Sequence, residues 1–125
     1  MKDHSLGRKE KLKSDKIINS LFQQGKSLFS FPIKMVFINL PAELGSSNHQ
    51  FSVSIPKKKF KKAVDRNRIK RLIREAYRTN KAIIANIPPK AMMAIYVSDK
   101  ELTYKEVERS IKNILTGLSK ANKES

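Results

Sequence analysis

Side chains that could catalyse a reaction are scarce in this sequence. It contains no Cys, which excludes a disulfide framework, a zinc-thiolate site and a cysteine nucleophile. Its two histidines, His4 and His49, have no second His at the spacing of a metal site. Asp99 and Glu101 could form a carboxylate pair, but they closely precede Thr103, and acidic residues are typical of the start of a helix. We therefore predict no catalytic residue and no metal site on the protein.

Cationic side chains are abundant instead. The 125 residues include 27 Lys and Arg against 11 Asp and Glu, a net charge of +16. Twelve basic residues and only two acidic ones lie between Lys57 and Lys81, so this segment alone has a charge of +10. A compact domain tolerates such self-repulsion when a polyanion neutralises it. Since 39% of the residues are hydrophobic, we expect a folded polyanion-binding domain rather than a disordered basic tail.

The positions of these charges predict a helix with two unlike faces. Between residues 63 and 78 the apolar side chains recur at i, i+3, i+4, i+7 and i+8. They are Ile69, Leu72, Ile73, Ala76 and Tyr77. On the opposite arc, at about 100° per residue, lie Asn67, Lys70, Arg71, Arg74 and Arg78. A guanidinium group can bind two phosphate oxygens, and the stripe of Ile, Leu and Ala suits a domain core, so nucleic acid is favoured over a membrane surface.

One helix and two strands are predicted before this basic helix. Residues 14–24 form an amphipathic helix, followed by Gly25 where a left-handed C-cap belongs. Residues 32–40 are fenced by prolines, which favours a strand, and residues 50–55 alternate between apolar and polar side chains. Since a turn is predicted over residues 43–48, we expect the two strands to form a hairpin.

A strand and a last helix are predicted after the basic helix. The apolar run at residues 91–97 does not alternate, which indicates a strand buried on both faces. It is the longest apolar run and is far shorter than the roughly 20 residues that span a bilayer. Thr103 and Glu106 form a capping box at the start of a helix that extends to Leu118. The predicted element order is therefore αββαβα.

These elements predict a single domain. It is a nucleic-acid-binding α/β domain over residues 14–118, between a basic flexible tail at residues 1–13 and a short flexible tail at residues 119–125. The basic N-terminus has no apolar block of the kind found in a signal peptide, and the absence of Cys fits a reducing compartment. We therefore expect a soluble, cytoplasmic protein with no membrane partner.

The basic helix also resembles a known family. The run KKAVDRNRIKRLIREAYR, residues 61–78, resembles the signature of the bacterial ribonuclease P protein subunit. The similarity extends over roughly residues 11–118. It implies an α+β fold, a small αββαβα sandwich of the ribosomal-protein-S5-domain-2-like type, with a left-handed βαβ crossover. It also implies a large catalytic RNA as the partner, which removes the 5′ leader of precursor tRNA by hydrolysis with bound Mg²⁺, while the protein itself supplies no catalytic residue.

The resemblance assigns two binding surfaces. The helix with the Arg-Asn-Arg motif would face the catalytic RNA through Lys62, Arg66, Asn67, Arg68, Lys70, Arg71 and Arg74. Additional basic contacts would come from Lys57, Lys58, Lys59, Lys61 and Arg78. A cleft between the first helix and the sheet would hold the single-stranded leader and would be lined by Ile18, Phe22, Lys34 and Phe37.

Three details of the cleft stay open at the level of the sequence. Ile18 stands where many relatives have an aromatic, so one stacking platform is lost. Phe22 shares a stripe with Leu21 and could equally be a core residue. Phe37 and Lys34 alternate onto opposite faces of one strand, only one of which can line a cleft, and base stacking makes Phe37 the preferred residue.

Two other functions fit a small basic domain. A ribosomal or other rRNA-binding protein would bind RNA without any effect on the cleavage of precursor tRNA. A DNA-binding domain is disfavoured, because predicted strands flank the basic helix on both sides and leave no helix-turn-helix pair.

Overall fold

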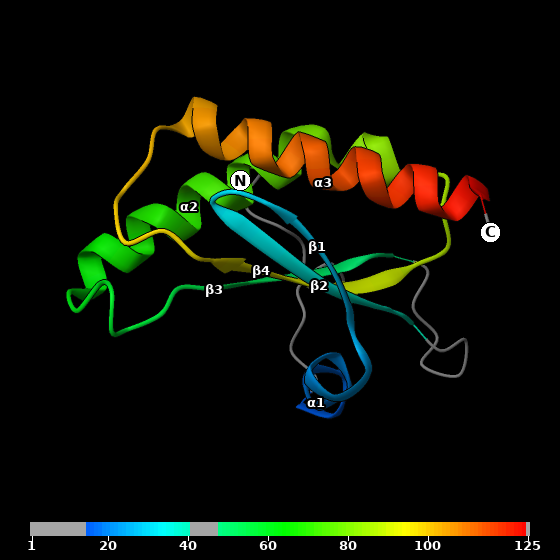
Figure 1. The fold of residues 1–125 in the computed structure, drawn as a ribbon, viewed down its shortest axis with the longest axis horizontal. Helices are drawn as coiled ribbons and strands as arrows, with labels where there is room; N and C mark the ends of the chain where they lie inside the picture. Colours follow the sequence, from blue (N-terminus) through cyan, green and yellow to red (C-terminus); the bar gives the residue numbers. More distant parts are fainter. Residues whose placement is uncertain (1–14, 41–47, 125) are drawn as a thin grey trace.

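Three helices and four strands account for most of the chain. The computed structural model describes residues 15–40 and 48–124. The elements, coloured along the chain in Figure 1, are α1 (Asp15–Gln24), β1 (Lys26–Ser30), β2 (Ile33–Asn39), β3 (Gln50–Ser54), α2 (Ala63–Asn80), the 3₁₀ helix η3 (Lys81–Ile84), β4 (Lys90–Tyr96) and α3 (Tyr104–Glu124).

The α+β class and the succession of the predicted elements are confirmed, with two additions. β1 was not predicted, because only Leu28 and Phe29 of its five residues are apolar and it lies at the edge of the sheet, where one side needs no strand partner. The 3₁₀ helix η3 continues directly from the end of α2.

The strand order corrects the predicted hairpin. The four strands are arranged β1-β2-β4-β3, so β4 separates β2 from β3. β4 is antiparallel to β2 and parallel to β3, and the true hairpin is β1–β2. The reason is the composition of β4, which is buried along almost its whole length and is therefore placed in the interior of the sheet. The connection β3–α2–β4 is the crossover for which the resemblance implies a left-handed sense.

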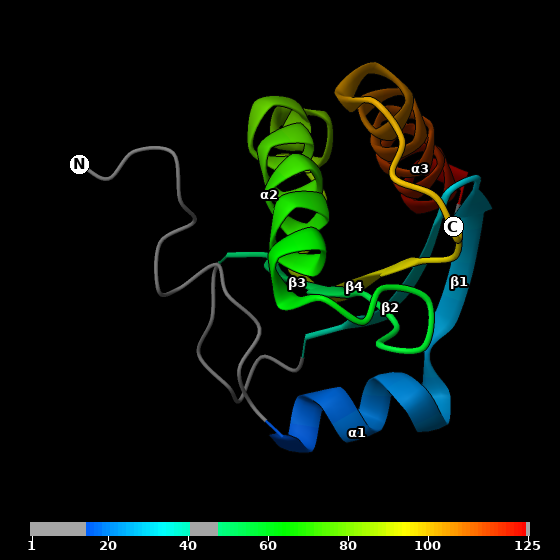
Figure 2. The same cartoon turned by 90° about the vertical axis from the view of Figure 1, so that its left-hand side faces the viewer.

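The helices cover the two faces of the sheet unequally. Figures 1 and 2 show α2 and α3 side by side on one face and α1 alone on the other. On the α2/α3 face the ring of Phe51 stacks on that of Tyr77, with centroids 4.1 Å apart and planes 3° apart. Met92 and Tyr96 of β4 are fully buried in the same core. A smaller cluster beneath α1 consists of Ile17, Leu21, Val36, Ala91 and Met93.

Gly25 is required by close packing and not, as the sequence suggested, by a left-handed backbone. Its φ lies outside the left-handed region. A Cβ atom at this position would lie 2.6 Å from Cγ1 of Val36 and would clash with the carbonyl oxygen of Leu21. The amide of Gly25 donates to that same oxygen at 3.0 Å. The glycine thus lets the end of α1 lie directly on β2.

The last helix begins as predicted but ends later. The amide of Thr103 donates to Oε1 of Glu106 at 3.1 Å, and the amide of Glu106 donates to Oγ1 of Thr103 at 3.3 Å, which confirms the capping box. α3 continues to Glu124, so residues 119–124 are helical rather than the start of a tail, as was predicted. The predicted tail at residues 1–13 lies outside the described residues.

Candidate nucleic-acid interface

The outer face of α2 is cationic and unpaired. Ile69, Ile73, Ala76 and Tyr77 turn the opposite side of the helix into the core. Asn67, Arg71 and Arg74 are exposed and Lys70 is half-buried. Within residues 15–40 and 48–124, no hydrogen bond or ion pair involves the side chains of these four outer residues. Their donors are therefore available to an anionic ligand.

Arg66 and Arg68 behave differently from this outer face. They lie about 200° apart around the helix, on its two flanks. Arg66 is half-buried and donates from Nη1 to the carbonyl oxygens of Phe60 and Lys61, at 2.7 and 3.0 Å. Arg68 donates to both carboxylate oxygens of Glu101, at 2.9 and 3.0 Å. Both arginines of the motif, which the resemblance assigns to the catalytic RNA, thus bind protein groups already.

Backbone hydrogen bonds and one buried ring fix the lysine-rich turn before α2, residues 57–62. The amides of Lys59 and Phe60 donate to the carbonyl oxygen of Pro56, and the ring of Phe60 is buried against that of Tyr96. Lys59 also donates from Nζ to the carbonyl oxygen of Val97 at 2.8 Å. Four other lysines of this segment remain exposed at the N-terminal end of α2, namely Lys57, Lys58, Lys61 and Lys62.

Lys62 is the N-cap of α2 and forms no side-chain capping bond. The positive end of the helix dipole therefore adds to the field of the neighbouring lysines. At the other end, Arg78 forms a two-bond ion pair with Glu75, at 3.0 and 2.6 Å, which partly neutralises its charge. The exposed basic side chains without an ion-pair partner within the described residues are therefore concentrated at the N-terminal and central turns of α2.

Only the β2 residues whose side chains lie on the α1 face of the sheet can line a cleft between α1 and the sheet. Val36 belongs to the cluster under α1, and Lys34 shares its face because side chains alternate along a strand. Phe37 lies on the other face, where it packs against the α2/α3 core with Nζ of Lys90 5.8 Å from its ring centroid. The prediction that Phe37 lines this cleft is therefore wrong.

Phe22 and Ile18 occupy the flank of α1. Phe22 is 63% exposed, which excludes the core interpretation of this side chain. Ile18 is half-buried and packs against the cluster beneath the helix. An exposed phenylalanine beside an apolar cluster is a surface suited to the face of a nucleobase.

Phe29 was missed by the sequence analysis. It is 64% exposed and is the cross-strand partner of Lys34 in β1. The same row continues across the sheet through Ile95 to Ser54, on the face that α1 covers only in part. The pairing of Phe29 with Lys34 could be found only by predicting β1 as a strand, and the polar composition of β1 gives no strand pattern.

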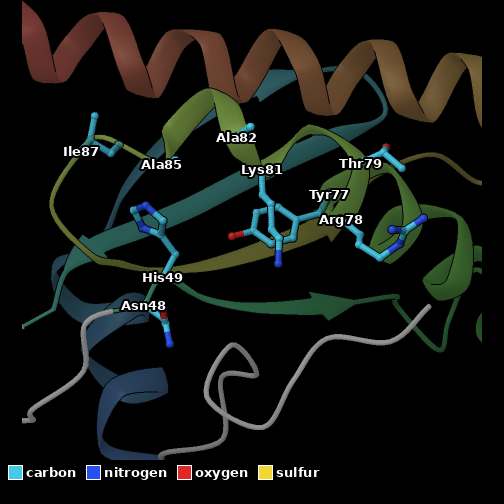
Figure 3. Close-up of a pocket in the computed structure, with 9 residues that line it drawn as sticks. All are labelled: Asn48, His49, Tyr77, Arg78, Thr79, Lys81, Ala82, Ala85 and Ile87. Carbon is cyan, nitrogen blue, oxygen red and sulfur yellow. The ribbon is translucent and has the colours of Figure 1, made fainter. Parts of the chain in front are cut away.

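A pocket of about 420 Å³ lies at the C-terminal end of α2 (Figure 3). Asn48, Arg78, Thr79 and Lys81 contribute polar groups to its wall. Nδ1 of His49 accepts from the amide of Lys90 at 3.0 Å, so Nε2 has the proton that is donated to the carbonyl oxygen of Ile84 at 2.7 Å. His49, which directly precedes β3, thus connects the start of this strand to η3 and β4.

The described residues also lack a cluster of metal-binding side chains and a membrane-spanning helix. Residues 15–40 and 48–124 contain no group of three or more His, Asp or Glu side chains that could hold a metal ion. No helix in the same ranges is long and apolar enough to cross a membrane.

Comparisons with known proteins identify a family. Residues 6–119 match the family described as Ribonuclease P. The ribonuclease P protein component of Porphyromonas gingivalis is 34% identical over 115 residues, which cover 88% of this chain and 83% of that protein. The corresponding protein of Clostridioides difficile is 37% identical over 110 residues, covering 86% and 90% of the two chains.

Solved structures share the fold. The ribonuclease P protein of Staphylococcus aureus superposes with a TM-score of 0.71 at 23% identity, over 87% of this chain and 94% of that one. The protein from Thermotoga maritima gives the same TM-score and identity over 86% and 96%. Together with the matched relatives, the fold and the arginine-rich helix lead to one conclusion: the chain belongs to the ribonuclease P protein family.

Proposed function

We propose that this protein is a subunit of ribonuclease P that binds the catalytic RNA through α2 and assists the removal of the 5′ leader from precursor tRNA. The observation that carries the proposal is the outer face of α2, where Lys70, Arg71 and Arg74 have no protein partner within the described residues. Such a face binds phosphates with a strong dependence on salt. The lysines at the N-terminal end of α2 extend the surface.

The leader would lie on the opposite side of the sheet. Phe22 and Phe29 are exposed apolar rings that can stack on bases, and Lys34 next to Phe29 can neutralise a phosphate. Val36 beneath α1 and the half-buried Ile18 of α1 belong to the apolar packing between this helix and the sheet, which would border the leader surface. The two RNA surfaces would therefore be separated by the sheet, so that catalytic RNA and leader can be bound together.

The hydrolytic chemistry would belong to the RNA. Mg²⁺ would be bound mainly by the catalytic RNA and would supply the activated water. On the protein, His49 is held between two backbone groups and Glu101 is paired with Arg68, which supports structural rather than catalytic roles for both. We place the activity in the cytoplasm, with no DNA partner.

The test is the cleavage of precursor tRNA by a ribonuclease P RNA at low Mg²⁺, with and without the protein. We expect the protein to increase cleavage and to leave the cleavage site unchanged. A ribosomal or other rRNA-binding protein would bind RNA in the same buffer without increasing cleavage, and that result would refute the proposal. The double variant Arg71→Ala/Arg74→Ala is the control, since it should need a higher protein concentration for the same effect.

A further inference from the structure

Arg68 forms an ion pair with a neighbouring segment through one nitrogen of its guanidinium group. Its Nη1 nitrogen donates to both carboxylate oxygens of Glu101 and lies 3.5 Å from Oδ1 of Asp65. Glu101 stands in the connection between β4 and α3, so the pair ties α2 to that connection. The hydrogen bond and charge of Glu101, and to a smaller extent the charge of Asp65, raise the pKa of Arg68.

The other edge of this guanidinium group is available. A guanidinium has five N–H donors, and three of them are on Nε and Nη2. Among the residues that the structure describes, neither nitrogen has a partner, and the side chain is 52% exposed. The edge formed by Nε and Nη2 has the geometry of a fork that holds two phosphate oxygens. Arg68 can therefore bind Glu101 and a phosphate at the same time.

We propose that Glu101 is a positioning residue for RNA binding: it holds Arg68 so that the Nε–Nη2 edge meets a backbone phosphate of the RNA on α2. The inference rests on the proposed function, because it requires RNA on this helix. A long arginine side chain loses rotamer freedom when a ligand immobilises it. Glu101 removes part of this loss before the RNA arrives, and it acts through Arg68 without touching the RNA.

The proposal predicts that removing Glu101 changes the affinity for RNA in the direction opposite to the one expected from charge alone. A carboxylate beside a polyanion site normally weakens binding by repulsion, so its removal should tighten binding if charge alone mattered. If Glu101 positions Arg68, its removal weakens binding, although the protein becomes more positive. The direction of the change therefore separates positioning from simple charge repulsion.

Asp99 provides a matched control. It lies two residues earlier in the same connection, is exposed, and forms no side-chain hydrogen bond or ion pair within the described ranges. We expect Glu101→Ala to bind the ribonuclease P RNA about 2- to 10-fold more weakly at fixed salt, the range for one long side chain that must be ordered. Asp99→Ala should bind as tightly as the wild type or slightly more tightly. Glu101→Gln keeps one acceptor oxygen and should fall between Glu101→Ala and the wild type.

A double-mutant cycle shows whether the effect passes through Arg68. In an Arg68→Ala background, Glu101→Ala should cause no further loss of affinity. An equal loss in both backgrounds, or tighter binding by Glu101→Ala in the wild-type background, would overturn the proposal. Thermal melting of each variant verifies that it is folded at the assay temperature.

The variant Arg71→Ala/Arg74→Ala distinguishes this proposal from the one on which it rests. If that variant binds the RNA as the wild type does, the RNA does not lie on α2 and both proposals fail. If it binds more weakly while Glu101→Ala does not, the interface stands and the positioning role of Glu101 is refuted.

Discussion

The two faces of the sheet are built for different tasks. On the α2/α3 face, Met92, Ala94 and Tyr96 of β4 are fully buried beneath two long helices. On the α1 face, the single shorter helix leaves Lys34 and Phe29 exposed, in the same cross-strand row. The closed face contains the larger cluster of buried hydrophobic residues, and the open face keeps apolar and cationic side chains available to a ligand.

The same contrast recurs on α2. The inner side of the helix completes the closed core, whereas its outer side has arginines with no carboxylate of their own. Arg66 and Arg68, on the flanks, have partners in neighbouring segments. Protein partners at the flanks and free donors at the centre make the helix a rigid support for an anionic ligand.

The largest expected effect is on stability, when either of two adjacent methionines on opposite faces of the sheet is replaced. Met92 is fully buried on the closed face, and Met93 lies beneath α1 on the open face. Met92→Ala should cost about 2–5 kcal/mol of unfolding free energy, and Met93→Ala should fall at or below the lower end of this range, because Met93 is 7% exposed and belongs to the smaller cluster. Urea denaturation measures both. Equal losses would show that the two faces are packed equally well.

The next largest effect should be on substrate affinity. Phe22→Ala should weaken the binding of precursor tRNA to the holoenzyme by about 1–3 kcal/mol, the range for one stacked base. Its melting temperature should hardly change, because the side chain is 63% exposed. Mature tRNA, which has no leader, is the control and should bind as before. A variant that loses affinity for both RNAs would remove Phe22 from the leader site.

Ile18→Phe tests the same surface in the opposite direction. An aromatic at this position would restore a stacking platform next to Phe22, so precursor tRNA should bind more tightly while mature tRNA does not. Equilibrium binding measurements with both RNAs give the ratio of precursor to mature tRNA affinity. An unchanged ratio would mean that position 18 contributes only to the apolar cluster, with which it already packs.

A smaller effect is expected for each arginine of the outer face of α2. Arg71→Ala and Arg74→Ala should each weaken binding to the catalytic RNA and lower the slope of log affinity against log salt by about 1. Circular dichroism should be unchanged, since both side chains are exposed. Binding titrations at several salt concentrations test this, and a slope identical to that of the wild type would place the RNA elsewhere.

The smallest effect is a dependence of stability on pH at the start of α3. The amide and hydroxyl of Thr103 donate to Glu106 and lower the pKa of its carboxyl group. The stabilisation is therefore complete above the unfolded pKa of about 4.3 and is lost as the pH falls through the lower, folded value. Glu106→Gln should make the melting temperature less dependent on pH in this acid range. If the melting temperatures of Glu106→Gln and the wild type changed with pH in the same way, the carboxylate of Glu106 would be excluded as the source of this pH dependence.

Much of this architecture was predictable because burial leaves a clear pattern. The helical spacing of Ile69, Ile73 and Ala76 predicted both faces of α2, and the unbroken apolar run of β4 indicated an interior strand. The edge strand β1 escaped, because a strand with one free edge and an exposed face needs few apolar residues. Without β1, neither the true hairpin nor the pairing of Phe29 with Lys34 could be found.

The interactions of individual charged side chains were not predictable. Composition indicated that the helix is cationic, but it could not show that Arg68 reaches Glu101, a residue far along the chain in another segment. The face of Phe37 was equally undetermined, because β2 has apolar side chains on both sides. Tertiary packing decides both, and a single sequence does not encode it in a local pattern.

The separation of the two RNA surfaces is best tested by one crossed experiment. Two double variants, Arg71→Ala/Arg74→Ala and Phe22→Ala/Lys34→Ala, are compared for their affinity for the catalytic RNA and for the ratio of precursor to mature tRNA affinity of the holoenzyme. We predict that the α2 variant loses affinity for the catalytic RNA and keeps the ratio. The sheet-face variant should bind the catalytic RNA as tightly as the wild type, and its ratio of precursor to mature tRNA affinity should fall. If either variant altered both quantities, or if the two effects were exchanged, the division of tasks between the two surfaces would be contradicted.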